Sequence, residues 1–293
     1  MKLYSDFDTA IHQVGDVLRD QSHEIKPFRW QSSDVSDRPE AAMRERLNVS
    51  FQVSLGGRED LGVFRSEIRP NLPWADDHFE ERVSGVPLNP GEQWRNWPWA
   101  LSADGHRKEE GKFSHTYMER YWPKRAGRGD DIDERGITST GAYIASHYGV
   151  RYAYGDLNDV VDHLGRDPLT RQAFLPVWFP EDTGVVHGQR VPCTLGYHFI
   201  LRNEYLHHTY YIRSCDFYRH FRDDLYLSVR LHLWILDRLR QLPLGAEPGR
   251  SFSQRFWDRV KPGLFTFHCV SMHLFINDAI KLWPEKYGKS PNT

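Results

Sequence analysis

The sequence of 293 residues has little cysteine, no excess charge of either sign and no long hydrophobic run. Three cysteines, at positions 193, 215 and 269, are too few and too widely spaced for a disulfide framework, so we expect a reducing, cytoplasmic compartment. With 38 Lys and Arg against 40 Asp and Glu, the chain lacks the basic surplus of proteins that bind nucleic-acid phosphates. No stretch approaches the about 18 apolar residues of a membrane span. Neither nucleic acid nor a membrane is therefore expected as a partner.

Hydrophobic and aromatic residues are plentiful. Hydrophobic residues make up 39% of the chain, which excludes a disordered protein and suffices for a sizeable core. The 10 Trp, 14 Tyr, 16 Phe and 15 His residues could line a site for a planar ligand or fill an ordinary core. The length fits one large domain or two small ones.

Hydrophobic periodicity predicts helices and strands that do not alternate strictly, which favours an α+β fold over a doubly wound sheet. The predicted helices cover residues 6–20, 74–84, 137–148, 155–165, 224–241 and 273–283. The predicted strands cover residues 48–55, 173–178, 192–201, 204–214 and 264–269. Residues 21–46 are expected to be irregular, and residues about 85–135 to form long loops of the kind that often carry function.

Cys193 is the first candidate for chemistry. It follows Pro192 at the head of an alternating segment, and Arg213 comes twenty residues later. If the two segments pair as neighbouring strands, Arg213 approaches Cys193, and a nearby cation lowers the pKa of a thiol. A buried structural cysteine is the alternative that the spacing alone favours. The paired spacing of a Cys/His zinc site is absent, so no metal is expected.

Four short segments follow one another in this region: residues 192–194 (PCT), 200–202 (ILR), 213–216 (RSCD) and 221–224 (FRDD). Together they resemble the signature of the thymidylate synthase superfamily. That signature is a proline-cysteine pair, a sheet segment, an Arg-Ser-x-Asp motif and a selectivity residue eight positions after its aspartate. The match is closest to the deoxycytidylate hydroxymethylase branch.

Weaker matches lie at residues 113–122 (FSHTYMERYW), 167–171 (DPLTR) and 271–275 (SMHLF). The resemblance covers roughly residues 75–283 in the same order. It implies a single catalytic domain over residues 1–293, with a mixed sheet packed with helices. It also implies a homodimer formed through the sheet face, with active sites shared between subunits.

The resemblance assigns roles to individual residues. Cys193 would add to C6 of a pyrimidine nucleotide, so that C5 can attack the one-carbon unit of 5,10-methylenetetrahydrofolate. Arg213 and Ser214 would bind the nucleotide phosphate, a dianion suited to a guanidinium fork. Arg171 would reach this phosphate from the partner subunit, and His273 would bind the sugar.

Asp224 would read the base. Thymidylate synthases have asparagine at this position, which pairs with uracil. A carboxyl group accepts from the amino group of cytosine and, when protonated, can donate to N3, so Asp224 favours cytosine. Asp223 would take this role if the alignment shifted by one residue. The structural alternative for Asp224 is a helix N-cap.

Glu81 is expected as the acid–base residue near C4 and C5, with Glu80 as the alternate. Tyr117 matches the family tyrosine that assists removal of the C5 proton. These two roles rest on the resemblance, and an exposed helical glutamate is the alternative for either carboxylate.

Asp216 would bind the folate, because the matching aspartate contacts the pterin in the family. Trp94 or Trp97 would line one side of the folate site. A strand-end aspartate and a core tryptophan are the structural alternatives. Phe275 departs from the family pattern, because a tyrosine there normally helps to bind the sugar 3′-OH.

The combined prediction is a cytidylate 5-hydroxymethyltransferase that converts dCMP to 5-hydroxymethyl-dCMP. The short polar segment after Trp283 favours water over hydride in the final step. Three alternatives stay open: reductive 5-methylation of dCMP, reaction on CMP, and an inactive homologue that binds a nucleotide or a protein.

Overall fold

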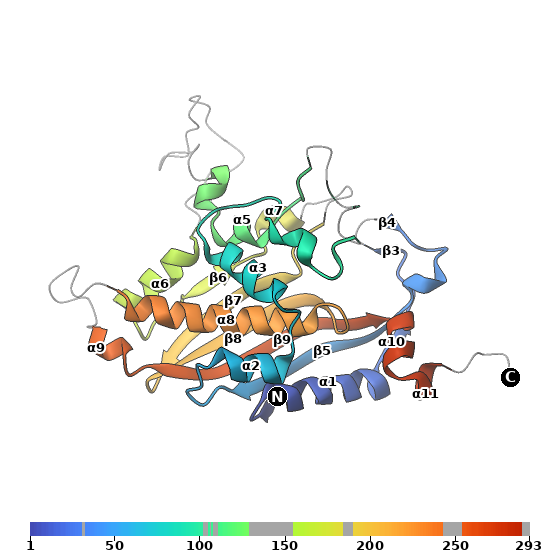
Figure 1. The fold of residues 1–293 in the computed structure, drawn as a ribbon, viewed down its shortest axis with the longest axis horizontal. Coiled ribbons are helices and arrows are strands. Elements are labelled where there is room, and N and C mark those ends of the chain that lie inside the picture. The colour runs from blue at the N-terminus through green and yellow to red at the C-terminus, as the bar shows by residue number, and fades with distance from the viewer. Residues whose placement is uncertain are drawn as a thin grey trace.

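A mixed seven-stranded sheet forms the centre of the computed structural model, and helices pack on it (Figure 1). The structure describes residues 1–30, 33–101, 105, 107, 111–128, 155–183, 190–242 and 254–288. The strand order is β1-β5-β9-β8-β7-β6, and β2 pairs with β5 off this path. The strands are β1 (Lys2–Tyr4), β2 (His23–Ile25), β5 (Met43–Ser54), β6 (Phe174–Pro176), β7 (Thr194–Arg202), β8 (Tyr205–Asp216) and β9 (Lys261–Phe275). The predicted α+β class is confirmed.

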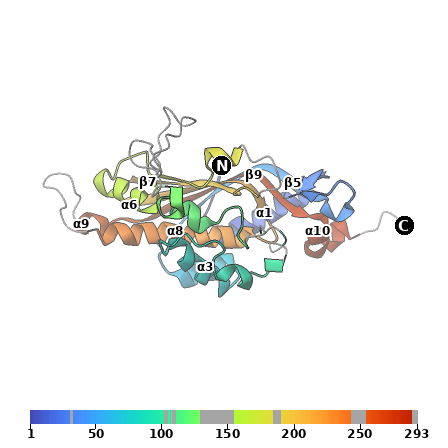
Figure 2. The same cartoon turned by 90° about the horizontal axis from the view of Figure 1, so that it is seen from above.

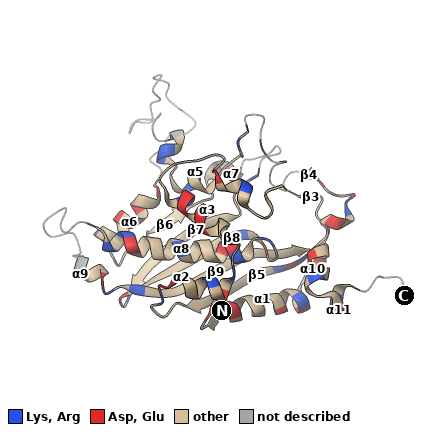
Figure 3. Cartoon of the chain, viewed as in Figure 1, with Lys and Arg blue, Asp and Glu red and all other residues tan. Residues whose placement is uncertain are grey.

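Helix α8 (Phe221–Arg240), the longest in the described ranges, lies along the sheet, and α3 (Trp74–Val83) packs on its outer side (Figure 2). The other α-helices of the described residues are α1 (Phe7–Gln21), α2 (Leu61–Ile68), α5 (Tyr117–Tyr121), α6 (Leu157–Arg166), α7 (Pro180–Thr183), α9 (Gln254–Trp257), α10 (Ile276–Leu282) and α11 (Pro284–Tyr287). Short helical turns cover Pro39–Ala41 (η1), Gln93–Asn96 (η2) and Lys124–Arg128 (η3), and β3 (Arg29–Trp30) pairs with β4 (Ser33–Asp34). Residues of both charge signs are interspersed along these elements (Figure 3).

Strand β8 sits between β7 and β9. It is antiparallel to β7 and parallel to β9. The β7–β8 turn is two residues long, and Asn203 and Glu204 both have positive φ (51° and 61°), which matches the strand twist of a tight hairpin. The pairing on which the approach of Arg213 to Cys193 depends is therefore present.

Alternation along β8 separates the two faces of the sheet. Leu206, His208, Tyr210 and Ile212 are buried on the helix side. The residues between them, at positions 207, 209, 211 and 213, are partly exposed on the opposite side. On that side Tyr211 stacks on His268 of β9, with ring centroids 5.3 Å apart.

Several predicted boundaries are wrong. Strand β9 continues to Phe275, so His273 lies on a strand, and the helix predicted from residue 273 begins at Ile276. Backbone pairing of His273 with Glu45 and with Asp216 fixes this end of β9 as sheet, which overrides the helical periodicity. Helix α8 begins at Phe221 after His220 as N-cap, so the N-cap alternative for Asp224 is also wrong.

Some elements of the structure were not predicted, and one predicted helix falls on residues that the structure does not describe. Helix α2 and strand β1 were not predicted, and residues 21–46 contain short strands in place of wholly irregular chain. Strand β6 is shorter than the predicted 173–178, and β7 begins one residue after Cys193. The helix predicted at 137–148 lies outside the described residues. No helix in the described ranges is long and apolar enough to cross a membrane.

His208 is fully buried on β8, and neither of its ring nitrogens has a hydrogen-bond partner within the described part of the chain. Its ring stacks on Phe199 at 4.6 Å and meets His232 edge-on at 5.6 Å. Burial, with small contributions from His232 and His198, holds the pKa of His208 well below its ordinary value.

We predict that His208→Phe makes the protein less sensitive to acid. The unfolded chain takes up a proton near pH 6.5, whereas the folded protein does not, so stability falls as the pH drops below that value. Between pH 7 and 5 this histidine should cost about 2 kcal/mol of unfolding free energy, which urea titrations of wild type and variant would measure. His12→Gln, at a side chain that is 62% exposed, is the control. Equal pH slopes for wild type and His208→Phe would contradict the prediction.

Candidate active site

Strand pairing brings Arg213 to Cys193, as the sequence predicted. The Arg213 amide donates to the Cys193 carbonyl at 2.8 Å. The Arg213 guanidinium turns back along the same segment, where Nε donates to the Pro192 carbonyl (2.9 Å) and Nη2 to the Val191 carbonyl (3.1 Å). These two hydrogen bonds hold the positive charge of Arg213 against the residues that directly precede Cys193.

The Cys193 side chain is partly exposed, and the other two cysteines are buried. Burial of the sulfur raises the pKa of Cys193, Arg213 and Arg190 lower it, and Asp224 raises it further. Arg213 lowers the pKa of Cys193, as predicted. The pKa of Cys193 is nevertheless raised overall, so the prediction of a more acidic thiol is wrong. Desolvation outweighs the two cations here.

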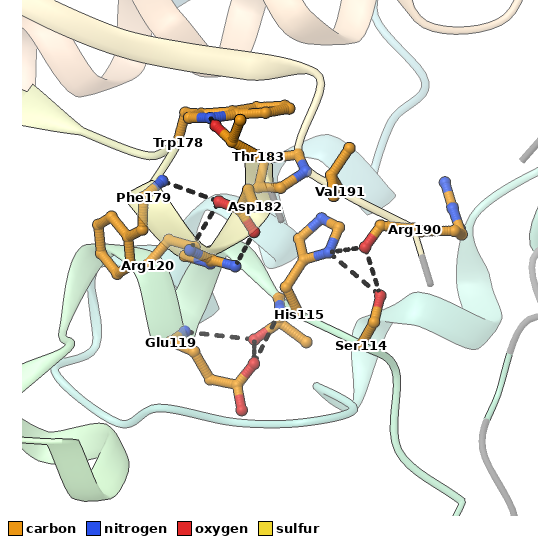
Figure 4. A network of polar contacts seen from close by, with 12 residues as sticks. Ser114, His115, Glu119, Arg120, Trp178, Phe179, Asp182, Thr183, Arg190 and Val191 are labelled. Carbon is orange, nitrogen blue, oxygen red and sulfur yellow. Dashed lines mark hydrogen bonds and ion pairs between the residues drawn. The ribbon is translucent and has the colours of Figure 1, made fainter. Parts of the chain in front are cut away.

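A second set of contacts holds the segment before Cys193 at Arg190 (Figure 4). The Arg190 carbonyl accepts from Ser114 Oγ at 2.7 Å and from His115 Nδ1 at 3.1 Å. Nearby, Arg120 donates to both oxygens of Asp182, at 3.0 and 2.8 Å, which secures the chain after β6. Sequence reasoning missed this support, since only the weak match at residues 113–122 pointed to it.

Tyr117 joins the site through a chain of hydroxyl groups. Its Oη lies 3.0 Å from Thr194 Oγ1, which lies 3.0 Å from Tyr210 Oη. Burial raises the pKa of Tyr117, and Cys193 and Asp224 raise it further against the opposing effect of Arg82. The phenol is therefore a neutral hydrogen-bonding group next to the residue that follows Cys193.

Asp224 and Asp223 differ in what they bind. The Asp223 carboxylate accepts from both the backbone and side-chain nitrogens of Asn71, each at 2.8 Å. Asp224 is contacted by the weak thiol donor of Cys215 at 3.6 Å. Burial raises the pKa of Asp224 to about 7, against the lowering effect of Arg82. Asp223 thus has a structural role, because its carboxylate holds Asn71. Asp224 is the carboxyl group that gains or loses its proton near neutral pH.

The two candidate glutamates differ in exposure and in hydrogen-bond partners. Glu80 is 68% exposed and pairs with Arg230 at 2.5 Å. Glu81 is 11% exposed and accepts from the Gln93 amide at 2.9 Å, with His78 Nδ1 at 3.3 Å. Burial raises the pKa of Glu81, but these hydrogen bonds outweigh it and the net pKa is lowered. Glu81 is therefore the ionised, inward-facing carboxylate.

Trp97 and Trp94 have different neighbours. Trp97 stacks on His220, the N-cap of α8, with centroids 4.7 Å apart. Trp94 packs edge-on against Phe113 at 5.4 Å and lies under Arg107. The structure thus places Trp97, and not Trp94, beside the end of α8 that carries Asp224.

Ser214 and His273 lie on adjacent strands, with Ser214 Oγ 3.5 Å from His273 Nδ1. Asp216 follows them, and its Oδ1 accepts from the amides of Tyr218 (2.9 Å) and Arg219 (3.0 Å). Asp216 therefore holds the turn between β8 and α8. Burial raises its pKa, and His273 opposes that effect.

Two further positions lie apart from this group. The Arg171 side chain is exposed and lines a surface hollow beside α6 together with Arg166 and Gln172. The Arg171 carbonyl accepts a hydrogen bond from Nε2 of His198, which lies on β7 four residues after Thr194. Phe275 is buried under the Arg219 guanidinium (4.5 Å) and against Trp30 (5.4 Å).

Comparisons with known proteins give no assignment. No model of a protein family matches the chain, and a search of curated proteins finds no match either. In the described part of the chain, no three His, Cys, Asp or Glu side chains are grouped to hold a metal ion. The structure joins Cys193 to Arg213 by a backbone hydrogen bond and, by way of Thr194, to Tyr117, and Asp224 is close enough to raise the pKa of Cys193. Ser214 lies beside His273, which pairs with Asp216. Glu81 and Trp97 contact His78 and His220 in turn.

We predict that Arg213→Met raises the pH midpoint for alkylation of Cys193 by iodoacetamide, because Cys193 loses the cation that lowers its pKa most. The rate at pH 7 should fall about 3- to 10-fold, and Arg213→Lys should fall less because it keeps the charge. Arg202→Met, at the far end of β7, is the control, and Cys193→Ala identifies the reactive sulfur. A midpoint that is unchanged in Arg213→Met would contradict the prediction.

Proposed function

We propose that the chain is a cytidylate 5-hydroxymethyltransferase that forms 5-hydroxymethyl-dCMP from dCMP and 5,10-methylenetetrahydrofolate. The observation that carries the proposal is the grouping of Cys193 with Arg213, Tyr117 and Asp224. These residues come from separate parts of the chain, and they match in order the residues that the sequence resemblance assigns to nucleotide chemistry.

In this proposal the Cys193 sulfur adds to C6 of the pyrimidine, and the electron pair moves to C5. C5 then bonds to the methylene carbon that the folate supplies, and the bond between that carbon and the folate nitrogen breaks, so that tetrahydrofolate leaves. Tyr117, held through Thr194, assists loss of the C5 proton. Water then adds to the exocyclic carbon, and the Cys193–C6 bond breaks to release the thiolate. Arg213 and Ser214 bind the phosphate, and for this the guanidinium exchanges backbone carbonyls for phosphate oxygens.

Asp224 supports cytosine as the base. With a pKa of about 7, this carboxyl is protonated in about half of the molecules at neutral pH. The protonated form donates to N3 while its other oxygen accepts from the amino group.

We extend the proposal to a homodimer through the open face of the sheet. On that face Val270 is 51% exposed, although it lies in the middle of β9. Arg171 lies apart from Cys193 in one subunit, which fits a phosphate site completed by Arg171 of the other subunit. The three free cysteines suit a reducing, cytoplasmic setting.

Incubation with dCMP and 5,10-methylenetetrahydrofolate, followed by mass spectrometry of the nucleotides, tests the proposal. We expect 5-hydroxymethyl-dCMP, and none from Cys193→Ala. A 5-methyl product with dihydrofolate would show a reductive enzyme, and turnover of CMP alone would show a ribonucleotide substrate. No product from either nucleotide would contradict the proposal.

Asp224→Asn should shift the preference from dCMP toward dUMP, because an amide pairs with uracil. The matched control is Asp223→Asn, whose carboxylate binds Asn71 and should affect stability without changing the preferred base. Competition between the two nucleotides for tritium release from C5 measures the preference. An unchanged preference in Asp224→Asn would show that the base is read elsewhere.

A further inference from the structure

His78 of α3 lies between a carboxylate and a cation of its own helix. Its Nδ1 is 3.3 Å from Glu81 Oε2, and its Nε2 is 3.0 Å from Arg82 Nε. The imidazole stacks on Trp74, with centroids 4.9 Å apart and planes 17° apart, and is 12% exposed. The ring therefore has one fixed orientation, with each nitrogen facing a different partner.

The identity of the partners fixes the tautomer. A guanidinium N–H can only donate, so His78 Nε2 must carry the lone pair. The proton is then on Nδ1, where it is donated to the Glu81 carboxylate. Burial and the charge of Arg82 lower the pKa of His78 to about 4, against Glu81, so the ring stays neutral at physiological pH.

Arg82 continues this chain toward the thiol. Its side chain is 5% exposed, and its guanidinium lies 4.1 Å from the centre of the Tyr117 ring. In the described ranges no carboxylate forms an ion pair with this guanidinium, although Asp224 is close enough to act on its charge. A buried arginine without a carboxylate partner is costly, which points to a role beyond packing.

We propose that His78 and Arg82 are positioning residues that join Glu81 to Tyr117 in one polar chain ending at Thr194, next to Cys193. The inference rests on the proposed function, because it concerns the acid–base groups of that same site. His78 acts through Glu81, whose carboxylate it orients. Arg82 acts through His78, whose tautomer it sets, and through Tyr117, whose ring it holds by a cation–π contact.

Nitrogen-15 NMR of the histidine rings tests the chain without substrate. The His78 signal, identified by its absence in His78→Gln, should show a neutral Nδ1–H tautomer from pH 8 to 5. In Arg82→Met the tautomer should become mixed, with a titration midpoint nearer the ordinary histidine value of about 6.5. Arg230→Met is the matched control, because Arg230 stacks on Phe79 at 4.3 Å and pairs with Asp76. An Nε2–H tautomer in wild type, or no change in Arg82→Met, would overturn the proposal.

A second experiment measures activity as the release of tritium from C5-labelled dCMP. His78→Phe keeps the ring stack on Trp74 but breaks both hydrogen bonds, so kcat should fall about 10- to 100-fold with little change in KM. His78→Gln can accept from Arg82 and donate to Glu81, and should recover most of the activity. Equal kcat for His78→Phe and wild type would overturn the proposal. No tritium release by wild type would instead overturn the proposed function, while the NMR result would still decide the role of Arg82.

Discussion

Strand β8 is hydrogen-bonded along one edge to β7 and along the other to β9, and these two pairings position the candidate residues of the three strands. The antiparallel pairing sets Arg213 against Cys193, and the parallel pairing sets Ser214 and Asp216 beside the end of β9 that carries His273. Since α8 begins five residues after β8 ends, the same strand also determines where Asp224 lies. A one-residue slip of β8 would move the side chains of this strand to the other face of the sheet.

Desolvation governs the chemistry of this group more than charge does. Burial is the largest influence on the pKa of Cys193, Tyr117 and Asp224, and in each case it favours the neutral form. Arg213 and Arg82 offset part of that effect without reversing it. The proposed reaction fits such a site, because a thiolate whose hydration is limited by partial burial adds readily to an electrophilic carbon.

The parts of the fold that repeat locally could be predicted. The alternation of residues 192–201 and 204–214 indicated two strands, and the approach of Arg213 to Cys193 was predicted on the condition that these strands pair. The continuation of β9 to His273 could not be predicted, because pairing with distant β5 and β8 decides it. Arg82 was missed for a similar reason: on a helix rich in charged residues its sequence context resembles a solvated surface, and only packing against Tyr117 shows it to be buried.

Covalent attack by Cys193 on the pyrimidine is the central claim, and 5-fluoro-dCMP tests it most directly. Fluorine cannot leave C5 as a proton does, so a reaction that begins by thiolate addition stops at the covalent adduct. Intact-mass spectrometry after incubation with 5-fluoro-dCMP and 5,10-methylenetetrahydrofolate should show the protein heavier by both ligands. Peptide mapping should place them on Cys193. Unmodified protein, or an adduct on another residue, would contradict the account.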